Sequence, residues 1–411
     1  MEFNTLLLHG TSIQKNSHRE ILPPISQVTA YSYESMEVLE KVFGHKSSGY
    51  AYSRIGNPTI SAFEQRINEL EGGNGAVCCS SGMAAISAAI LAVCKSGDEI
   101  IARTGLYGGT IDLLHDLEKL GIHTVFTKEM TEDSLKPLIN EKTRLIFAEM
   151  ISNPALQVLD VATVSKIAHD SQIPLFVDST TATPFIIKPI SYGADVVIHS
   201  TSKYLNGGGN SIGGVIVDGG KFAWDTTKHT ALAEFKKYGK FAFLVRLRTD
   251  IWENLGGCMA PMNAFLSCIG LDTLGLRMER ICNNADKLAK ALSELEGIEV
   301  NYLTLGNHPY HDYVEKELKG YGGGILTFRA GSKERAFRII NSLQYALIAS
   351  NIGDIRTLVI HPASTLYLRT DKEETEAAGV FEDTIRISVG IEDSEDLIRD
   401  FVSAVKESVN A

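Results

Sequence analysis

One lysine in the sequence lies where it can do covalent chemistry. Lys203 belongs to the polar run 199–209, with the sequence His-Ser-Thr-Ser-Lys-Tyr-Leu-Asn-Gly-Gly-Gly, and a largely apolar run at 194–198 precedes it. An amine at the end of a buried strand loses hydration, which lowers its pKa towards the range where it is nucleophilic. The hydroxyls of Ser200 and Ser202 can bind a phosphate, and the glycines allow a ligand to approach the backbone. This combination is typical of a lysine that holds pyridoxal 5′-phosphate as a Schiff base, although a surface lysine in a polar loop has the same composition.

A carboxylate stands at the end of another apolar run. Asp178 follows residues 174–177 and precedes Ser179 and Thr180. A carboxylate beside a pyridine nitrogen keeps that nitrogen protonated, so that the ring can accept electrons. The chain between Asp178 and Lys203 is long enough for one crossover between neighbouring parallel strands. A buried ion pair or a cap is the structural alternative, but a lysine at the end of the next strand would complete a catalytic site.

Three other turns carry residues suited to a phosphorylated ring. The backbone N–H groups of Gly82 and Met83 begin an expected helix, where they can receive a phosphate, although a plain serine cap has the same sequence. Tyr107 can stack on a flat heteroaromatic ring, and Asn153 can hydrogen-bond the ring oxygen or the substrate. An ordinary turn tyrosine and an ordinary Asn-Pro turn are the alternatives.

Two arginines are candidates for binding anions. Arg386 alternates with two isoleucines in an expected strand, so it faces away from them, and its guanidinium can bind a substrate carboxylate through two hydrogen bonds. An arginine on an exposed strand face fits this pattern equally well. Tyr52 and Arg54 are two residues apart in an extended segment and therefore share a face, which suits a phosphate clamp or an ordinary surface pair.

The elements that must position these residues alternate along the chain. Strands are expected at 75–79, 99–102, 124–126, 144–149, 174–178, 194–198 and 213–217, with helices at 58–71, 83–94, 110–120, 132–139 and 161–170. This rhythm indicates an α/β fold whose mostly parallel central sheet is covered by helices on both faces. Ligands bind at the carboxyl ends of such strands. Every candidate above lies at a strand end, apart from the N-terminal pair and Arg386, which lies within its strand.

The rest of the chain suggests two further regions. Residues 1–57 lack periodicity and predict an extended arm, and residues 58–250 form the expected large cofactor-binding domain. Residues 251–411 are expected to form a smaller C-terminal α/β domain. Its expected elements are a long helical region at 262–296, strands at 325–328 and 384–389, and helices at 333–342 and 395–409.

Composition excludes several classes of function. The 411 residues carry a net charge of −11 without a basic run, so nucleic acid and anionic membranes are not expected partners. No stretch has the length and apolarity of a membrane span or the pattern of a signal segment, which predicts a soluble cytoplasmic protein. The six cysteines form no C-x-x-C pair and are expected to be reduced core residues, with no metal site. A G-x-G-x-x-G motif is also missing from the sequence, which argues against a nicotinamide dehydrogenase.

The motifs also occur together in a characteristic order. They are Tyr52-x-Arg54-x-Gly56-Asn57-Pro58-Thr59, Ser81-Gly82-Met83, Leu106-Tyr107-Gly108, Asn153-Pro154, Val177-Asp178, His199-Ser200-x-Ser202-Lys203-Tyr204 and His361-Pro362-Ala363-Ser364. This series resembles the Cys/Met-metabolism enzymes that use pyridoxal phosphate, such as cystathionine γ-synthase, methionine γ-lyase and O-acetylhomoserine sulfhydrylase. The resemblance spans nearly the whole chain.

The resemblance implies a pyridoxal-phosphate-dependent transferase of fold type I. It further implies a homotetramer built as a dimer of dimers, with each active site shared across a dimer. It assigns the cofactor to Lys203, the phosphate to Gly82, Met83, Ser200 and Ser202, and a second phosphate contact to Tyr52 and Arg54 of a neighbouring subunit. The remaining roles are ring stacking and proton transfer for Tyr107, the pyridinium partner for Asp178, cofactor and substrate binding for Asn153, and substrate binding for Arg386 and Thr357.

Within this family, several runs are similar to the O-acetylhomoserine sulfhydrylases. These runs are 351–354, 357–365 and 377–380, and Gly109 stands where the methionine γ-lyase branch has Cys. The chain departs from the family at Met150-Ile151-Ser152, usually Thr-Pro-Ala, and at Ser202, usually Thr. The expected reaction is replacement at the γ-carbon of an O-acylhomoserine, expected to be O-acetylhomoserine, by sulfide or a small thiol, giving homocysteine or methionine. Methionine γ-lyase, a cystathionine γ-synthase or lyase type of reaction, and a homologue that binds without catalysis are the alternatives.

Overall fold

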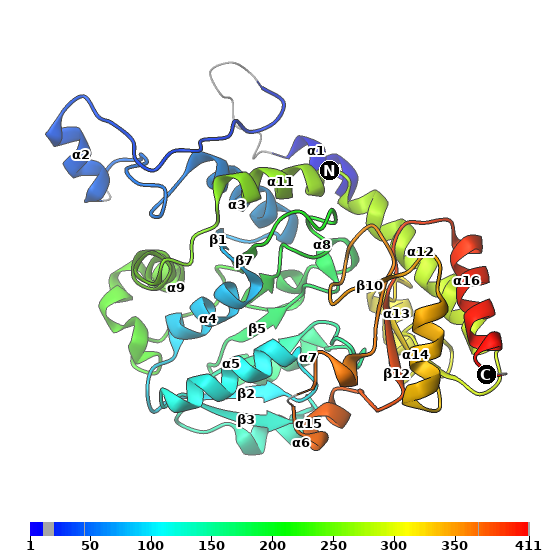
Figure 1. Ribbon diagram of the computed structural model, residues 1–411. Coiled ribbons are helices and arrows are strands. Elements are labelled where there is room, and N and C mark those ends of the chain that lie inside the picture. The colour runs from blue at the N-terminus through cyan, green and yellow to red at the C-terminus, as the bar shows by residue number, and fades with distance from the viewer. Residues whose placement is uncertain (11–19, 45, 369, 410–411) are drawn as a thin grey trace.

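A seven-stranded sheet forms the centre of the computed structural model, which describes residues 1–10, 20–44, 46–368 and 370–409 (Figure 1). Its strand order is β1-β7-β6-β5-β4-β2-β3. Strands β6, β5, β4, β2 and β3 are parallel to one another, whereas β7 runs antiparallel to both β1 and β6. The bounds are Gly75–Cys79 (β1), Glu99–Arg103 (β2), His123–Thr127 (β3), Thr143–Glu149 (β4), Leu175–Asp178 (β5), Val196–His199 (β6) and Gly214–Asp218 (β7). The mostly parallel central sheet predicted from the alternating pattern is therefore confirmed.

Helices cover both faces of this sheet (Figure 1). They are α3 (Pro58–Glu71), α4 (Gly82–Val93), α5 (Gly108–Lys119), α6 (Glu132–Leu135) with the 3₁₀ turn η1 (Lys136–Leu138), α7 (Val161–Asp170), α8 (Thr183–Ile186) and the 3₁₀ turn η2 (Pro189–Tyr192). Side chains alternate between the faces, so that Cys78 joins the core beneath α3 and Cys79 joins the core beneath α4. Local capping fixes where the helices begin, since Asn57 accepts from the N–H of Thr59 and Ser81 accepts from that of Ala84.

A five-stranded sheet forms a second layer at the C-terminal end. Its order is β10-β11-β12-β9-β8, with bounds Glu299–Asn301 (β8), Ile325–Arg329 (β9), Leu347–Ile348 (β10), Leu358–Ile360 (β11) and Thr384–Ser388 (β12). Its helices are α13 (His311–Glu317), α14 (Lys333–Ser342), the 3₁₀ turn η5 (Pro362–Ser364), α15 (Lys372–Ala377) and α16 (Ser394–Glu407). The sequence pattern missed β8, β10 and β11, because each is only two or three residues long and shows no complete alternation.

The helical region predicted at 262–296 is two helices rather than one. Helix α11 (Pro261–Asp272) ends at Thr273, and α12 (Leu274–Ser293) begins directly after it. Arg277 stabilises this break, because its guanidinium donates to the carbonyl oxygens of Gly270 and Tyr204 at 2.7 Å each. The break is thus set by contacts with the turn that follows β6, which a helical periodicity cannot reveal.

Between β7 and α11 the chain forms short helical segments. They are the 3₁₀ segment η3 (Thr230–Phe241), α9 (Ala242–Arg246), the π-helical turn η4 (Leu247–Trp252) and α10 (Glu253–Leu255). Trp252 packs in the core beneath α4, and Leu271 of α11 packs in the core beneath α3. The domain boundary predicted at residue 250 stays a prediction.

The N-terminal segment has two short helices. Helix α1 (Phe3–His9) packs against α12, α11 and α3, whereas α2 (Met36–Phe43) stands away from the body on extended chain (Figure 1). A bridge between Ala30 and Tyr52 pairs the two extended parts with each other. In the parts of the chain that the structure describes, no helix combines the length and apolarity needed to cross a membrane.

Candidate active site

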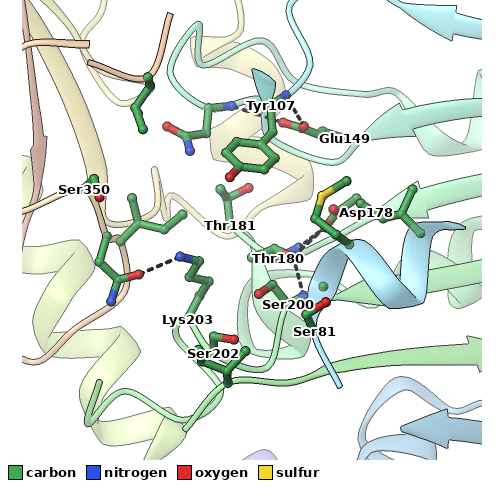
Figure 2. Close-up of a pocket in the computed structure, with 18 of the residues that line it drawn as sticks. Ser81, Tyr107, Glu149, Asp178, Thr180, Thr181, Ser200, Ser202, Lys203 and Ser350 are labelled. Carbon is green, nitrogen blue, oxygen red and sulfur yellow. Dashed lines mark hydrogen bonds between the residues drawn. The ribbon is translucent and has the colours of Figure 1, made fainter. Parts of the chain in front are cut away.

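A cavity of about 450 Å³ opens at the carboxyl ends of β4, β5 and β6 (Figure 2). This size is typical of a site for a small ligand or cofactor. Side chains from the large sheet, from the turn before α4 and from the C-terminal sheet line it together. The lining residues that the following paragraphs use are Gly82, Met83, Tyr107, Glu149, Asn153, Asp178, Ser200, Ser202, Lys203, Asn351 and Arg386.

Lys203 projects into this cavity from the turn after β6 (Figure 2). Its side chain is half-buried, and Nζ donates to Oδ1 of Asn351 at 2.6 Å. Burial lowers the pKa of Lys203 from its ordinary value, and the nearby guanidinium of Arg386 lowers it further. A lysine amine in this setting spends more time in the neutral, nucleophilic form than one at the surface.

Asp178 is the last residue of β5, which pairs with β6. Asp178 and Lys203 therefore lie at the ends of neighbouring strands, as the sequence predicts. Oδ1 of Asp178 accepts from the backbone N–H and the hydroxyl of Thr180, at 2.9 and 2.6 Å. Burial raises the pKa of Asp178, against the hydrogen bonds from Thr180 and the charge of His199, which lower it. A cation placed against this carboxylate, such as a pyridinium nitrogen, would stabilise its ionised form.

A narrow cradle lies between the start of α4 and the turn after β6. A Cβ atom on Gly82 would lie only 2.7 Å from Cβ of Ser200, so the two backbones meet at a position where only glycine fits. The first N–H groups of α4 have no partner within the helix and point, with its dipole, towards this cradle. The hydroxyl of Ser202 exchanges hydrogen bonds with the backbone of Gly213, whereas Met83 lines the cavity beside Gly82.

Arg386 lines the cavity from β12 and is 3% exposed, so the alternative of an arginine on an exposed face is wrong. Its Nη1 donates to Oδ1 of Asn153 at 3.3 Å, and its Nη2 donates to the carbonyl oxygen of Asn351 at 3.1 Å. Its Nε has no hydrogen-bond partner within the described residues. Burial lowers the pKa of Arg386 to about 10, which leaves it cationic at neutral pH. A buried guanidinium with an unused donor is suited to a carboxylate ligand.

Tyr107 stands just before α5 with its ring at the cavity (Figure 2). The residue is 42% exposed, which is consistent with a ring face available for stacking.

Three predicted site residues lie outside the cavity. The hydroxyl of Thr357 is buried and donates to Oε2 of Glu392 at 2.8 Å. Arg54 donates to the carbonyl oxygen of Glu253 at 2.7 Å, and its guanidinium lies over the ring of Tyr52. Neither Tyr52 nor Arg54 lines the cavity of its own chain, and the position of Thr357 gives no support to a substrate contact.

Glu149 and Asn351 are among the cavity residues that the residue pattern does not single out. Glu149 ends β4 beside Asp178, and the same signal that marked Asp178, a carboxylate after an apolar strand, marks it too. Asn351 belongs to the loop before β11. In the sequence it stands out only as part of the run 351–354, which is similar to the O-acetylhomoserine sulfhydrylases. Its contact with Lys203 spans 148 residues of the chain, which local pattern cannot predict.

These residues fit pyridoxal 5′-phosphate. The cradle at Gly82 offers backbone N–H groups and the hydroxyl of Ser200 to a phosphate, whereas the hydroxyl of Ser202 donates to the carbonyl oxygen of Gly213. Asp178 offers a carboxylate to the ring nitrogen, and Lys203 offers an amine to the aldehyde.

Comparisons with known proteins agree with this geometry. The model of the family described as Cys/Met metabolism PLP-dependent enzyme matches residues 4–406. The O-acetyl-L-homoserine sulfhydrylase of Leptospira meyeri is 36% identical, over 98% of this chain and 96% of the relative. The homocysteine synthase of Schizosaccharomyces pombe is 37% identical, over 98% of each chain.

A solved structure shows the same likeness in three dimensions. A Campylobacter jejuni protein assigned as an O-acetylhomoserine (thiol)-lyase superposes with a TM-score of 0.94 at 35% identity, covering 99% of this chain and 100% of its own. That crystal structure contains N′-pyridoxyl-lysine-5′-monophosphate. The predicted fold class, a type I pyridoxal-phosphate-dependent transferase, is thereby confirmed.

Proposed function

The chain belongs to the Cys/Met metabolism PLP-dependent enzymes, and on this premise we propose that it replaces the acetyl ester of O-acetylhomoserine by sulfide or a small thiol. The products are acetate and homocysteine, or methionine where the thiol is methanethiol. We propose that the reaction serves methionine biosynthesis and takes place in the cytoplasm. The observation that carries the proposal is the set of charged groups at the cavity: one lysine, one buried arginine and the Glu149–Asp178 pair. A single buried cation besides the lysine suits a substrate with one carboxylate.

When bound, pyridoxal 5′-phosphate supplies an acceptor for the electrons released at the α- and β-carbons of an amino acid. Asp178 holds the proton of the ring nitrogen by pairing with it, and Tyr107 covers one face of the ring. Arg386 binds the α-carboxylate of the substrate with the help of Asn153. The amine of Lys203, when free, takes the α-proton and returns protons to the carbon chain, and Asn351 holds that amine at the cavity wall.

The shape and charge of the cavity favour a neutral acyl group. Lys203 and Arg386 are the only cations among the described residues that line it, and both are assigned to other tasks. The remaining wall includes the apolar side chains of Ile212, Ile352 and Leu366. A succinyl or phosphoryl group would place a second anion there without a partner, which is costly to desolvate.

We therefore expect O-acetylhomoserine to have a kcat/KM at least about tenfold above those of O-succinyl- and O-phosphohomoserine with sulfide. Purified protein assayed for homocysteine with each ester, at equal sulfide, measures this ratio. A preference for either charged ester would contradict the proposal. Omission of sulfide gives the control, because a lyase would release 2-oxobutanoate from methionine or the ester without any acceptor.

The region around Gly109 supports replacement over methionine cleavage. A Cβ atom at Gly109 would lie 2.7 Å from the ring of Tyr107 and 3.4 Å from the sulfur of Met83. The Tyr107 ring thus occupies the space that a cysteine would need at the position where the lyase branch carries one.

The N-terminal arm supports a homotetramer with active sites shared across each dimer. The arm exposes apolar side chains, among them Ile21 in its extended part and Met36 and Phe43 at the two ends of α2, which a single chain leaves unburied. Tyr52 and Arg54 lie on this arm, outside the cavity of their own chain, and Arg54 would exchange its bond to the carbonyl oxygen of Glu253 for the phosphate of a neighbouring subunit.

Mixing two inactive variants tests this sharing. Lys203→Ala and Arg54→Ala chains, dissociated and reassociated together, should regain about a quarter of wild-type activity at limiting cofactor, because each mixed dimer rebuilds one intact site. Activity equal to the mean of the two parents would place Lys203 and Arg54 of the same chain in one site. Each variant reassociated alone is the control.

A further inference from the structure

Glu149 has two hydrogen bonds that the proposed chemistry does not use. Its Oε1 accepts from the backbone N–H of Tyr107 at 2.6 Å, and its Oε2 accepts from that of Asn153 at 3.2 Å (Figure 2). The carboxylate therefore joins two loops that are far apart in the sequence, one after β2 and one after β4. A side chain that bridges two loops in this way restrains both of them.

The position of Glu149 relative to the cofactor site is fixed by the sheet. Glu149 and Asp178 are direct partners in the parallel β4–β5 ladder, so both side chains project from the same face of the sheet, and neighbouring strands lie about 4.8 Å apart. Glu149 is 6% exposed and lines the cavity. The stacking ring and the ring-nitrogen partner are thus tied to neighbouring strand ends.

A second carboxyl beside Asp178 is energetically unfavourable, so its presence at this strand end indicates a function. Burial and the neighbouring charge of Asp178 raise the pKa of Glu149 to about 8, against the hydrogen bonds from Tyr107 and Asn153, which lower it. Among the described residues, no cation forms a salt bridge with Glu149. A neutral or apolar side chain at this strand end would avoid that penalty.

The hydrogen bonds of Glu149 continue into the rest of the site. Asn153, held through its backbone by Glu149, accepts from Arg386 through its side chain. Arg386 in turn donates to the carbonyl oxygen of Asn351, whose side chain accepts from Lys203. The network begins at Glu149 and includes the groups assigned to the ring and the carboxylate.

We propose that Glu149 is a positioning residue that holds Tyr107 against the cofactor ring and holds Asn153 beside Arg386. It touches neither substrate nor reacting atoms and acts through these two residues. The inference rests on the proposed function, because it concerns the same cofactor. It adds to the site a residue that orients other residues and takes no part in the chemistry.

Glu149→Gln tests the proposal with little change of shape. The amide oxygen can accept one of the two N–H groups, but the amide nitrogen then faces the other. We expect the dissociation constant of pyridoxal phosphate to rise at least about tenfold. The circular dichroism of the bound cofactor at saturation should also fall, because the stacking ring is no longer held at one tilt. Glu118→Gln is the matched control, since Glu118 also accepts a backbone N–H, from Thr124, on an exposed helix end.

Two further measurements separate positioning from general stability. Glu149→Gln keeps the volume of the side chain and one of its two hydrogen bonds, and it removes a carboxyl whose charged form burial and Asp178 disfavour, so the Tm of the cofactor-free full-length chain should stay within about 2 °C of wild type. In a Tyr107→Ala background, Glu149→Gln should cost much less cofactor affinity than in wild type, because the two act together.

Wild-type cofactor affinity and circular dichroism in Glu149→Gln would overturn the inference. So would a large loss of Tm accompanied by a wild-type dichroism signal at saturation, since Glu149 would then be structural only. Failure of the wild-type chain to bind pyridoxal phosphate would instead overturn the proposed function, and the two outcomes are distinct.

Discussion

Lys203→Ala is expected to reduce the rate of γ-replacement by at least about 10³-fold. The substitution removes both the amine that binds the cofactor aldehyde and the group that moves the α-proton. No other lysine lines the cavity in the part of the chain that the structure describes, so no neighbour can take over either task. The measurement is homocysteine formation from O-acetylhomoserine and sulfide at saturating cofactor.

Lys188→Ala is the control for that experiment. Lys188 is also half-buried, and burial also lowers its pKa, but it lies outside the cavity. Its replacement should leave turnover within about threefold of wild type, because a substitution away from the site acts mainly on stability. Undiminished turnover in Lys203→Ala would show that this lysine is not required for the reaction.

Asp178→Asn is expected to lower kcat by about 10²- to 10³-fold. The amide keeps the shape of the side chain and can still accept from Thr180 through its oxygen, so the fold should be retained. It cannot hold a proton on the pyridine nitrogen by charge, and the ring then accepts electrons poorly. The loss should fall mainly on kcat, because the interaction strengthens as the ring gains electrons.

The matched control is Asp160→Asn at the N-cap of α7. Asp160 accepts from the N–H of Thr163 there, and asparagine caps a helix about equally well. Activity of that variant should be unchanged. If Asp178→Asn retains wild-type kcat, the carboxylate does not act on the ring, and the orientation of the cofactor proposed for this cavity is wrong.

The sequence predicts the parts of this structure that depend on local pattern. The strands of the central sheet alternate with helices and end in polar residues, so the neighbouring positions of Asp178 and Lys203 follow from one crossover length. The helix at Pro58–Glu71 follows from an asparagine cap, a proline at its first position and Gly72, whose φ of 72° ends it.

What the sequence does not predict depends on contacts between distant segments. Asn351 meets Lys203, and Arg386 meets Asn153, only because the five-stranded sheet packs against the end of the seven-stranded one. The break at Thr273 depends on Arg277 binding the turn after β6. Thr357 was assigned to the substrate from resemblance, whereas its hydroxyl is taken by Glu392.

The role of Glu149 cannot be predicted from the sequence for a different reason. Its sequence signal equals that of Asp178, a carboxylate that ends an apolar strand, but its partners are backbone N–H groups rather than side chains. Residue types along the chain say nothing about where free backbone donors will converge. Only the folded loops reveal that two of them point at one carboxylate.

The central claim is that the amine of Lys203 binds the aldehyde of the cofactor. Borohydride reduction of the purified protein, followed by peptide mass spectrometry, fixes that bond and locates it. The expected result is a phosphopyridoxyl group on Lys203, with the visible absorbance band of the unreduced protein lost in parallel. A modification confined to another lysine, or a protein saturated with cofactor that yields no modified peptide, would contradict the account.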